Sequence, residues 1–365
     1  MSEIAYWVAF NLIPGLGRVR FGQLLDQFGS LEKAWDAGPE ELIEAGISDA
    51  LVRRIVERRS SIEPQAELRR LDESDIRVLN IDDGSYPESL KHIYDPPPLL
   101  YVKGSLLTDE DCPLAVVGTR KATMYGKEAT ERLVRDLVRN GVVIVSGLAR
   151  GIDTVAHQVA LSEGGRTIAV LACGLDIIYP PENAKLAQKI AENGALISEY
   201  PPGVKPRAEN FPRRNRIMSG ISLGTLVIEA TERSGALITA RMALEQDREV
   251  FAVPGNIFAA SSKGSNRLIR DGAKLVLDVE DVLEELNLSM MPRQMAFSGI
   301  TPETQTEELL LRHLCMGPVH IDELCRSAGL PASAVSSTLT MMELKGMVSQ
   351  LGNMNYIVSQ GVDTK

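Results

Sequence analysis

In the middle of the chain, short runs of apolar residues alternate with amphipathic stretches of helical periodicity. Seven runs have the length and β-branched composition of strands, namely Leu114–Val117, Val142–Ser146, Thr167–Ala172, Ala195–Ser198, Leu223–Ile228, Glu249–Val253 and Leu275–Leu277. Amphipathic segments lie between them, namely Ala129–Arg139, Ile152–Ser162, Ala184–Glu192 and Ala236–Glu245. Continuously apolar strands that alternate with helices indicate a parallel sheet covered on both faces. We therefore predict a doubly wound α/β domain over residues 86–287.

The first 85 residues are helical in character and contain a tight turn between two helical stretches. The turn reads Ile13-Pro14-Gly15-Leu16-Gly17, and an amphipathic run with Phe21, Leu24, Leu25 and Phe28 follows it. A Pro-Gly-apolar-Gly turn is typical of helix-hairpin-helix modules, in which N–H groups at a helix N-terminus can hold a phosphate. A structural or partner-binding helical domain fits the pattern at least as well, so both interpretations stay open for residues 1–85.

The end of the chain reads as a linker and a small helical domain. Residues 288–303 combine Pro, Gly and Ser without periodicity, which predicts a linker. Residues 304–365 are expected to form helices at Glu307–Cys315, Ile321–Ala328 and Ala332–Lys345 and then a hairpin, the order of a winged helix. Over Thr304–Val358, three Lys and Arg residues against five acids give −2, and the third helix lacks side chains suited to reading base edges. A protein–protein or accessory role is therefore expected for this domain.

Composition limits the possible partners. The chain has a formal net charge of −10, which argues against non-specific coating of duplex DNA. No apolar run approaches the ~20 residues needed to cross a bilayer, and the N-terminus lacks the basic region of a secretory signal, so we expect a cytoplasmic protein that does not engage membranes.

The cysteines form no C-x-x-C pair, and the cluster of His313, Cys315, His320 and Cys325 fits no usual zinc spacing. Reduced, buried thiols and no metal or cofactor are predicted.

One segment departs from the acidic character of the chain. Pro201–Gly220 carries five cations against the single acid Glu209, so five minus one gives a local charge of +4. The cations are Lys205, Arg207, Arg213, Arg214 and Arg216. Guanidinium groups match phosphate geometry, and Phe211 adds a flat surface on which a base can stack. The segment is predicted to be a basic loop that binds nucleic acid, with a solvated charged loop as the alternative.

Glycine-rich and basic loops follow the predicted strands, at the edge where parallel sheets bind ligands. Gly118 to Lys121 and Gly147 to Asp153 follow the first two strands, and Ser219-Gly220, Leu223–Thr225 and a +3 segment from Lys263 to Lys274 are expected at the same edge. The glycines that would let the backbone approach a phosphate are Gly118, Gly147, Gly151 and Gly220, with the cations Arg120, Lys121, Lys263 and Arg267 beside them. These loops match neither the dinucleotide nor the Walker fingerprint.

Three residues that could act as acids or bases lie near these loops. Asp153 and His157 lie four positions apart on one predicted helix, and Glu229 closes a predicted strand. A helix N-terminal carboxylate explains Asp153, and a packed histidine explains His157. The sequence places no nucleophile beside a base, so we predict a binding protein and no enzyme.

Four motifs, taken together, resemble a known family. VVGTR (Val116–Arg120), VSGLARGID (Val145–Asp153), FPRRNRI (Phe211–Ile217) and VPG (Val253–Gly255) occur in the order and spacing of the DprA/Smf family, and the three-part layout is also similar. The resemblance implies an N-terminal helix-hairpin-helix or SAM-like domain, an extended Rossmann-like domain and a C-terminal winged helix.

The function that this resemblance implies is handling of incoming DNA. Members of the family bind and protect single-stranded DNA in natural transformation and load the RecA recombinase onto it for homologous recombination. They dimerise through the Rossmann-like domain. Carried over by motif, Arg120 and Lys205 would contact phosphates and Phe211 would pack against a base. The same groove would be lined by Arg213, Arg214 and Arg216, with Lys263 at its far side.

A rival interpretation comes from the related fold of cytokinin-activating phosphoribohydrolases. Leu223–Thr225 together with Glu229 is similar to their P-G-G-x-G-T-x-x-E loop. Here Ile221 and Ser222 stand where that loop has paired glycines, which puts a tight nucleotide pocket in doubt. A nucleotide-binding hydrolase of this kind is the alternative function.

Overall fold

The computed structural model describes residues 2–108, 111–288, 304–314, 319–345, 347–350 and 354–358. The chain divides into two compact units, Met1–Met291 and Pro292–Lys365. The predicted linker at residues 288–303 lies, except for Leu288, outside the described residues. No helix among the described residues is long and apolar enough to cross a membrane.

Nine strands of the described residues form one sheet in the order β1-β2-β6-β5-β4-β3-β7-β8-β9. All seven predicted strands are present, as β3 (Cys112–Val117), β4 (Val142–Ser146), β5 (Thr167–Val170), β6 (Ala195–Ser198), β7 (Gly224–Val227), β8 (Glu249–Ala252) and β9 (Lys274–Leu275). Neighbouring strands among these seven are parallel. The predicted α/β class is therefore confirmed.

Two further strands, which the sequence pattern did not predict, make the sheet mixed. β1 (Arg77–Asn80) pairs antiparallel with β2 (Leu99–Gly104), and β2 pairs antiparallel with β6. β1 is only four residues long and lies within the range predicted to be helical. Such a short strand is stabilised by its partner β2, so its own residues give little periodicity to detect.

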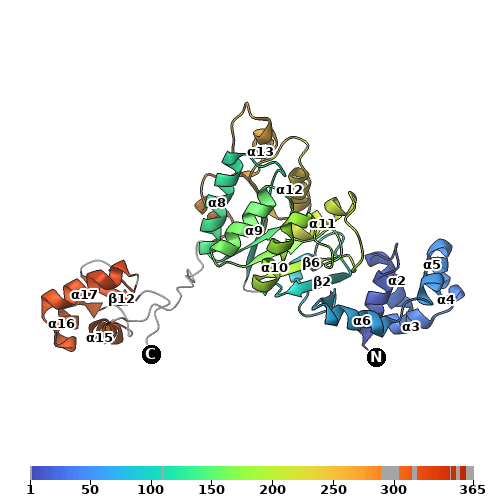
Figure 1. Ribbon diagram of the computed structural model, residues 1–365, viewed down its shortest axis with the longest axis horizontal. Helices are drawn as coiled ribbons and strands as arrows, with labels where there is room; N and C mark the ends of the chain where they lie inside the picture. Colours follow the sequence, from blue (N-terminus) through green and yellow to red (C-terminus); the bar gives the residue numbers. More distant parts are fainter. Residues whose placement is uncertain are drawn as a thin grey trace. The chain divides into compact units, whose positions relative to one another are not determined.

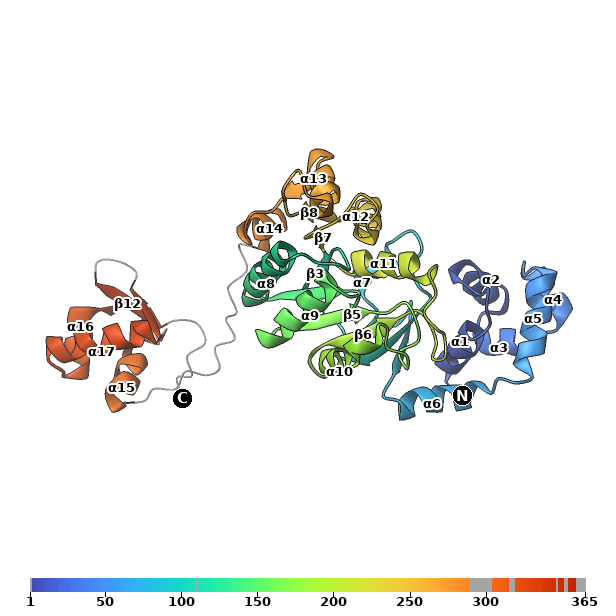
Figure 2. The same ribbon diagram turned by 45° about the horizontal axis from the view of Figure 1, so that its top comes forward.

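Helices cover both faces of this sheet (Figure 1). The helices α8 (Met124–Arg139), α9 (Ile152–Ser162), α10 (Ala184–Asn193) and α14 (Glu280–Glu285) pack on one face. The helices α7 (Glu88–Lys91), α11 (Asn210–Gly220), α12 (Gly235–Glu245) and α13 (Lys263–Arg270) pack on the other, where Figure 2 shows α11 and α12 near one another.

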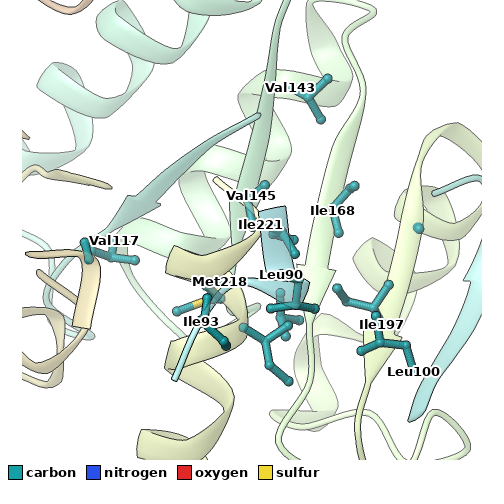
Figure 3. Close-up of a cluster of buried hydrophobic side chains, with 14 of the residues drawn as sticks. Leu90, Ile93, Leu100, Val117, Val143, Val145, Ile168, Ile197, Met218 and Ile221 are labelled. Carbon is teal, nitrogen blue, oxygen red and sulfur yellow. The ribbon is translucent and has the colours of Figure 1, made fainter. Parts of the chain in front are cut away.

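Alternation along each strand divides the core between these two faces. In β4, Val143 and Val145 point toward the face that carries α11, whereas Val142 and Ile144 point toward α8 and α9. This is the period of two that a pleated strand imposes. Figure 3 shows the first of these cores, to which the strand residues Val145 and Ile168 and Met218 of α11 all belong.

The N-terminal region is a cluster of short helices with an aromatic core. Its helices are α1 (Glu3–Asn11), α2 (Arg18–Phe28), α3 (Leu31–Asp36), α4 (Pro39–Glu44), α5 (Asp49–Arg59) and α6 (Pro64–Glu73). Trp7 stacks on Phe21 with ring centroids 5.0 Å apart, which ties α1 to α2. The predicted hairpin joins these two helices, and Gly15 adopts a φ of +101° there. The Arg54 guanidinium donates to the Pro14 carbonyl oxygen at 2.6 Å and so braces the hairpin from α5.

The second unit has the order of a winged helix. It contains α15 (Gln305–Leu314), β10 (Val319–His320), α16 (Ile321–Ala328), α17 (Ala332–Leu344), β11 (Val348–Gln350) and β12 (Asn355–Val358). The three strands form a sheet in the order β10-β12-β11. Leu310, Leu324, Leu339 and Met342 are fully buried between the helices. The three predicted helices and the hairpin are thus confirmed, and β10 was not predicted.

Cys173 and Cys325 are free thiols. Cys173 is buried, whereas Cys112 and Cys325 are half-buried. Cys315, one member of the cluster weighed as a zinc site, lies outside the described residues. Burial raises the pKa of the Cys173 thiol to about 11, which keeps it protonated at neutral pH.

Candidate nucleic-acid interface

The loops that follow β3, β4 and β7 interlock at the carboxyl edge of the sheet. The Ile152 amide donates to the Thr119 carbonyl oxygen at 3.2 Å, and the Thr119 amide donates to the Glu229 carbonyl oxygen at 2.7 Å. Gly151 has a φ of +78°, and a Cβ there would clash with the Thr119 carbonyl oxygen. A Cβ on Gly118 would likewise clash with Ile152. Both glycines are therefore required by contacts between the loops, whatever ligand binds at their surface.

Two buried side chains of opposite charge hold the loop after β4. Asp153 is 6% exposed, and its carboxylate accepts from the amides of Gly147 and Ala149 at 3.2 and 3.3 Å. Arg214 is 4% exposed and donates to the carbonyl oxygens of Gly147 and Val170. Burial raises the pKa of Asp153, while the Arg214 charge opposes that shift. Burial also lowers the pKa of Arg214 to about 10, so the guanidinium stays charged.

This placement contradicts the prediction that Arg214 lines the groove. The Arg214 side chain is almost fully buried, and its Nη1 and Nε atoms donate to groups inside the protein, so Arg214 braces the loops and is not free to contact a phosphate in solvent. A Cβ on Gly147 would fall on the Arg214 guanidinium, so this glycine makes room for an internal arginine. Arg216 is also mostly internal, because it pairs with Glu199 and lies 3.6 Å from the Asp95 carboxylate.

Two predicted residues that are far apart in the sequence come together at the surface. The Arg120 guanidinium carbon lies 5.2 Å from the centroid of the Phe211 ring, in cation–π geometry. The Phe211 ring also contacts Tyr179 edge-on, with centroids 5.8 Å apart. Tyr179 was missed by the sequence analysis, although an exposed aromatic shortly after β5 would have suggested it. Arg120 and Tyr179 thus fix the Phe211 ring at the edge of the sheet.

Further exposed cations lie in the loop after β3 and in the segment 201–220. Lys121, Lys205 and Arg213 are exposed, and within the described residues their side chains make no ion pair or hydrogen bond. Arg207 is exposed as well, with the Glu209 carboxylate 3.8 Å away. Exposed cations without a partner in the protein do not have to give up an ion pair when they contact a phosphate, so these side chains are available for phosphate binding.

A cavity of about 740 Å³ joins this segment to the N-terminal helices. The hairpin from Ile13 to Arg18 forms one wall, and Lys205, Arg207 and Arg213 contribute to the opposite side. Arg18, which the sequence analysis did not select, is exposed in this wall and donates to the Tyr94 carbonyl oxygen at 3.2 Å. The hairpin therefore lies beside the basic segment, which sequence alone could not establish.

Lys263 is brought to the same edge by backbone contacts. The Gly264 amide at the start of α13 donates to the Ala230 carbonyl oxygen in the loop after β7, at 2.7 Å. Lys263 is exposed at the first position of this helix. Arg267, one turn further along, forms an exposed ion pair with Asp271 at 3.3 Å. Lys263 thus stays available for a ligand, whereas Arg267 already has a partner.

Part of the predicted edge is wrong. The segment Asn210–Gly220 is the helix α11, not a loop, and Gly220 ends it just before β7 begins. A Cβ on Gly220 would press into Leu90 and Ile93, so the glycine permits helix packing. Gly224 is the first residue of β7 and therefore lies at its amino end. The amino and carboxyl ends of parallel strands lie at opposite edges, so neither glycine is near the groove.

The candidate acid–base residues serve the fold. His157 is fully buried and its Nδ1 lies 2.7 Å from Thr167 Oγ1, which itself donates to the Ile144 carbonyl oxygen. The Glu229 carboxylate accepts from the amide and hydroxyl of Thr123, the N-cap of α8. The packed-histidine interpretation is thus confirmed.

Burial of His157 predicts a specific dependence of stability on pH. Desolvation lowers the pKa of His157 from 6.5 to about 3. Between these two pH values the imidazole is therefore protonated in the unfolded chain and neutral in the folded chain. The free energy of unfolding should therefore fall by about 1.4 kcal/mol per pH unit as the pH drops from 6.5 toward 3. Urea unfolding of His157→Gln at several pH values should show a shallower slope than the parent. Parallel curves would show that His157 is not responsible.

Comparison with known proteins agrees with this architecture. Residues 77–287 match the family model of DNA recombination-mediator protein A, and residues 298–354 match that of the DprA winged helix domain. The chain is 37% identical to Protein Smf of Synechocystis, over 97% of this chain and 98% of that protein. The X-ray structure of DNA processing protein A from Streptococcus pneumoniae matches with a TM-score of 0.69 at 37% identity, covering 78% of this chain and 98% of that one. DNA processing protein A from Helicobacter pylori, whose structure is described as showing a single-stranded DNA binding mode, matches with a TM-score of 0.53 at 34% identity, over 59% of this chain and 96% of that one.

Proposed function

Because the chain belongs to the DNA recombination-mediator protein A family, also called DprA/Smf, we propose that its carboxyl-edge groove binds single-stranded DNA during natural transformation. The observation that carries this proposal is the Arg120–Phe211 pair, a flat aromatic ring held at the surface beside unpaired cations. We call this surface the strand groove, defined by Arg120, Lys121, Lys205, Phe211 and Arg213. The described binding mode of the Helicobacter pylori relative supports the proposal.

The chemistry of these residues suits a single strand better than a duplex. Phosphates would lie along Arg120, Lys205 and Arg213, with Lys263 continuing the path. A base would stack on Phe211, an interaction that contributes about 1–3 kcal/mol per base and requires the base to be unpaired. The strand groove is local, and the chain as a whole is acidic, so binding should be confined to it.

We further propose that the strand is held and handed on, without being cut. The engagement of Asp153, His157 and Glu229 in internal hydrogen bonds supports a binding role. Following the family, the strand would be protected and transferred to RecA in the cytoplasm, by a homodimer formed through the α/β unit. The phosphoribohydrolase alternative is disfavoured, because Gly224 and Thr225, which resemble part of its phosphate-binding loop, belong to the strand β7 and not to a loop.

Replacing Phe211 tests the base-stacking part of the proposal. Phe211→Ala should weaken binding of fluorescent oligo-dT about tenfold, the loss of one stacked base. The dependence of affinity on salt should stay as in the parent, because the phosphate contacts remain. Phe211→Trp should restore binding. Fluorescence anisotropy over a salt series, with single-stranded and duplex DNA of the same length, gives all three results.

Equal affinity of the parent for the two forms of DNA would overturn the proposed function. A Phe211→Ala protein that binds oligo-dT as tightly as the parent would also overturn the proposed function, because the Arg120–Phe211 pair would then have no part in binding.

A further inference from the structure

The N-terminal helices contain two hairpins of the same design. The first, residues 13–17, joins α1 to α2 and has Gly15 at a φ of +101°, and the second, residues 45–48, joins α4 to α5 and has Gly46 at a φ of +82°. A Cβ on Gly15 would lie 3.0 Å from Arg54 Nη1 of α5, and a Cβ on Gly46 would lie 2.9 Å from Gln23 Nε2 of α2. Each hairpin thus lies against the helix that follows the other one, so the two can be compared position by position.

The two hairpins differ in charge where the next helix begins. The N-cap of α2 is Gly17 and its first residue is Arg18, whereas the N-cap of α5 is Ser48 and its first residue is Asp49. The N-terminus of a helix attracts anions, and an acidic side chain in the first turn already meets that attraction. The first turn of α2 has no acidic residue. Of the two hairpins, the first is therefore the one suited to a phosphate.

Neither the backbone nor the packing requires a glycine at position 17. The φ of Gly17 is −118°, which any residue can adopt, and a Cβ there would meet no atom of the described residues within 4 Å. Gly118 and Gly151, by contrast, are needed for contacts inside the protein. The amides of Gly17 and Arg18 make no hydrogen bond within the described residues. An exposed glycine beside unbonded amides allows a ligand to approach the backbone closely.

This helix start borders the cavity of about 740 Å³ between the N-terminal helices and the basic segment. We call it the hairpin cavity, defined by Gly17, Arg18, Lys205, Asn210 and Arg213. Five cations and two acids line it, so five minus two gives +3. The two acids both flank Arg216. Arg18, Lys205 and Arg213 therefore have no acidic partner within the described residues and stay available for an anion.

A buried polar atom in the same lining lacks a partner. Asn210, the first residue of α11, is 5% exposed, and its Nδ2 donates to the Ala172 carbonyl oxygen at 3.1 Å. Its Oδ1 accepts no hydrogen bond within the part of the chain that the structure describes. Buried polar groups are nearly always hydrogen-bonded, so this oxygen points to a ligand that brings a donor. An unpaired base carries such N–H donors.

We propose that the first hairpin binds a backbone phosphate of the strand that occupies the strand groove. The strand would continue past Lys205 and Arg213 into the hairpin cavity. The amides of Gly17 and Arg18 would hold the phosphate there, and Asn210 Oδ1 would accept from the adjoining base. The inference rests on the proposed function, and it gives the N-terminal helices a part in DNA binding.

Gly17→Asp tests the hairpin site with a change that the fold should accept. Asp is a favoured N-cap residue, so the melting temperature should stay the same or rise. Its carboxylate would bond the amides and repel a phosphate, so the affinity for oligo-dT should fall about tenfold. The slope of log affinity against log salt should flatten by about 0.7, the share of one phosphate contact. Fluorescence anisotropy over a salt series measures both quantities.

Ser48→Asp is the matched control. Ser48 is the exposed N-cap at the equivalent position of the second hairpin, and it does not line the hairpin cavity. This variant adds the same charge and should bind oligo-dT as the parent does. Equal losses of affinity in the two variants would make net charge the cause and overturn the inference. A Gly17→Asp protein that melts well below the parent would show that the fold needs this glycine, which also overturns it.

Failure of the inference and failure of the proposed function give different results. A Gly17→Asp protein with parental affinity for oligo-dT, beside a Phe211→Ala protein that binds weakly, overturns the hairpin site alone. A parent that binds oligo-dT no better than duplex DNA overturns the proposed function, and the inference falls with it.

Discussion

Reversing the charges of Arg120 and Lys205 together should weaken the binding of oligo-dT by about 100-fold or more. Both side chains are exposed, and each is placed to make a charge-assisted bond to a phosphate, worth about 1.5–3 kcal/mol. Arg120→Glu also removes the cation that lies over Phe211, so the stacking surface loses one of its supports. The loss should be the same for all base sequences, because phosphates carry no sequence information.

The salt dependence of the same Arg120→Glu/Lys205→Glu protein identifies the contacts that were lost. Each phosphate contact to a single strand adds about 0.7 to the slope of log affinity against log salt, so the slope should flatten by about 1.4. Arg132→Glu/Lys189→Glu is the matched control, with the same change in net charge on exposed positions of α8 and α10. If the control loses as much affinity as the double variant, general charge and not the strand groove governs binding.

Replacing Arg214 should cost stability instead of binding. Arg214→Met leaves Asp153 as a buried carboxylate without its cationic neighbour and leaves the Gly147 and Val170 carbonyl oxygens without a donor. Leaving a buried charge without its opposite neighbour and removing these hydrogen bonds should together cost about 3–5 kcal/mol. Urea unfolding should show this loss, with an unchanged denaturant slope if both states keep their compactness.

The neighbouring residue provides the comparison. Arg213 is exposed and unpaired, so Arg213→Met should change the free energy of unfolding by less than about 0.5 kcal/mol while weakening oligo-dT binding. Adding Asp153→Asn to Arg214→Met should recover part of the lost stability, because the isolated charge is removed. An Arg214→Met protein as stable as the parent would contradict the bracing role.

The strands of the α/β unit could be predicted because strands that are buried on both faces consist almost entirely of apolar residues. Runs such as Val142–Ser146 are buried on both faces, so every residue is apolar or small and the pattern is strong. β1 was missed because a four-residue strand that depends on β2 carries no such pattern. The helix α11 was read as a loop because its arginines, proline and asparagines obscure the apolar stripe formed by Ile217 and Met218.

The candidate site was predictable in kind but not in detail. Composition showed that cations and one aromatic gather between residues 201 and 220, and motifs linked them to Arg120. Successive residues of a helix point about 100° apart, so Arg213 faces solvent while Arg214 enters the core. Charge counting treats the two alike. Tyr179 and Arg18 were missed because each is a single residue in its own segment.

By itself, the sequence determined the α/β class, the winged helix, the family and a basic, aromatic-containing segment, because these depend on local composition, periodicity and ordered motifs. Only the tertiary structure decided which arginines are free to bind and which brace the loops, and that the hairpin lies beside Lys205. The physical reason is that exposure and hydrogen-bond partners depend on residues distant in the chain, which no local pattern records.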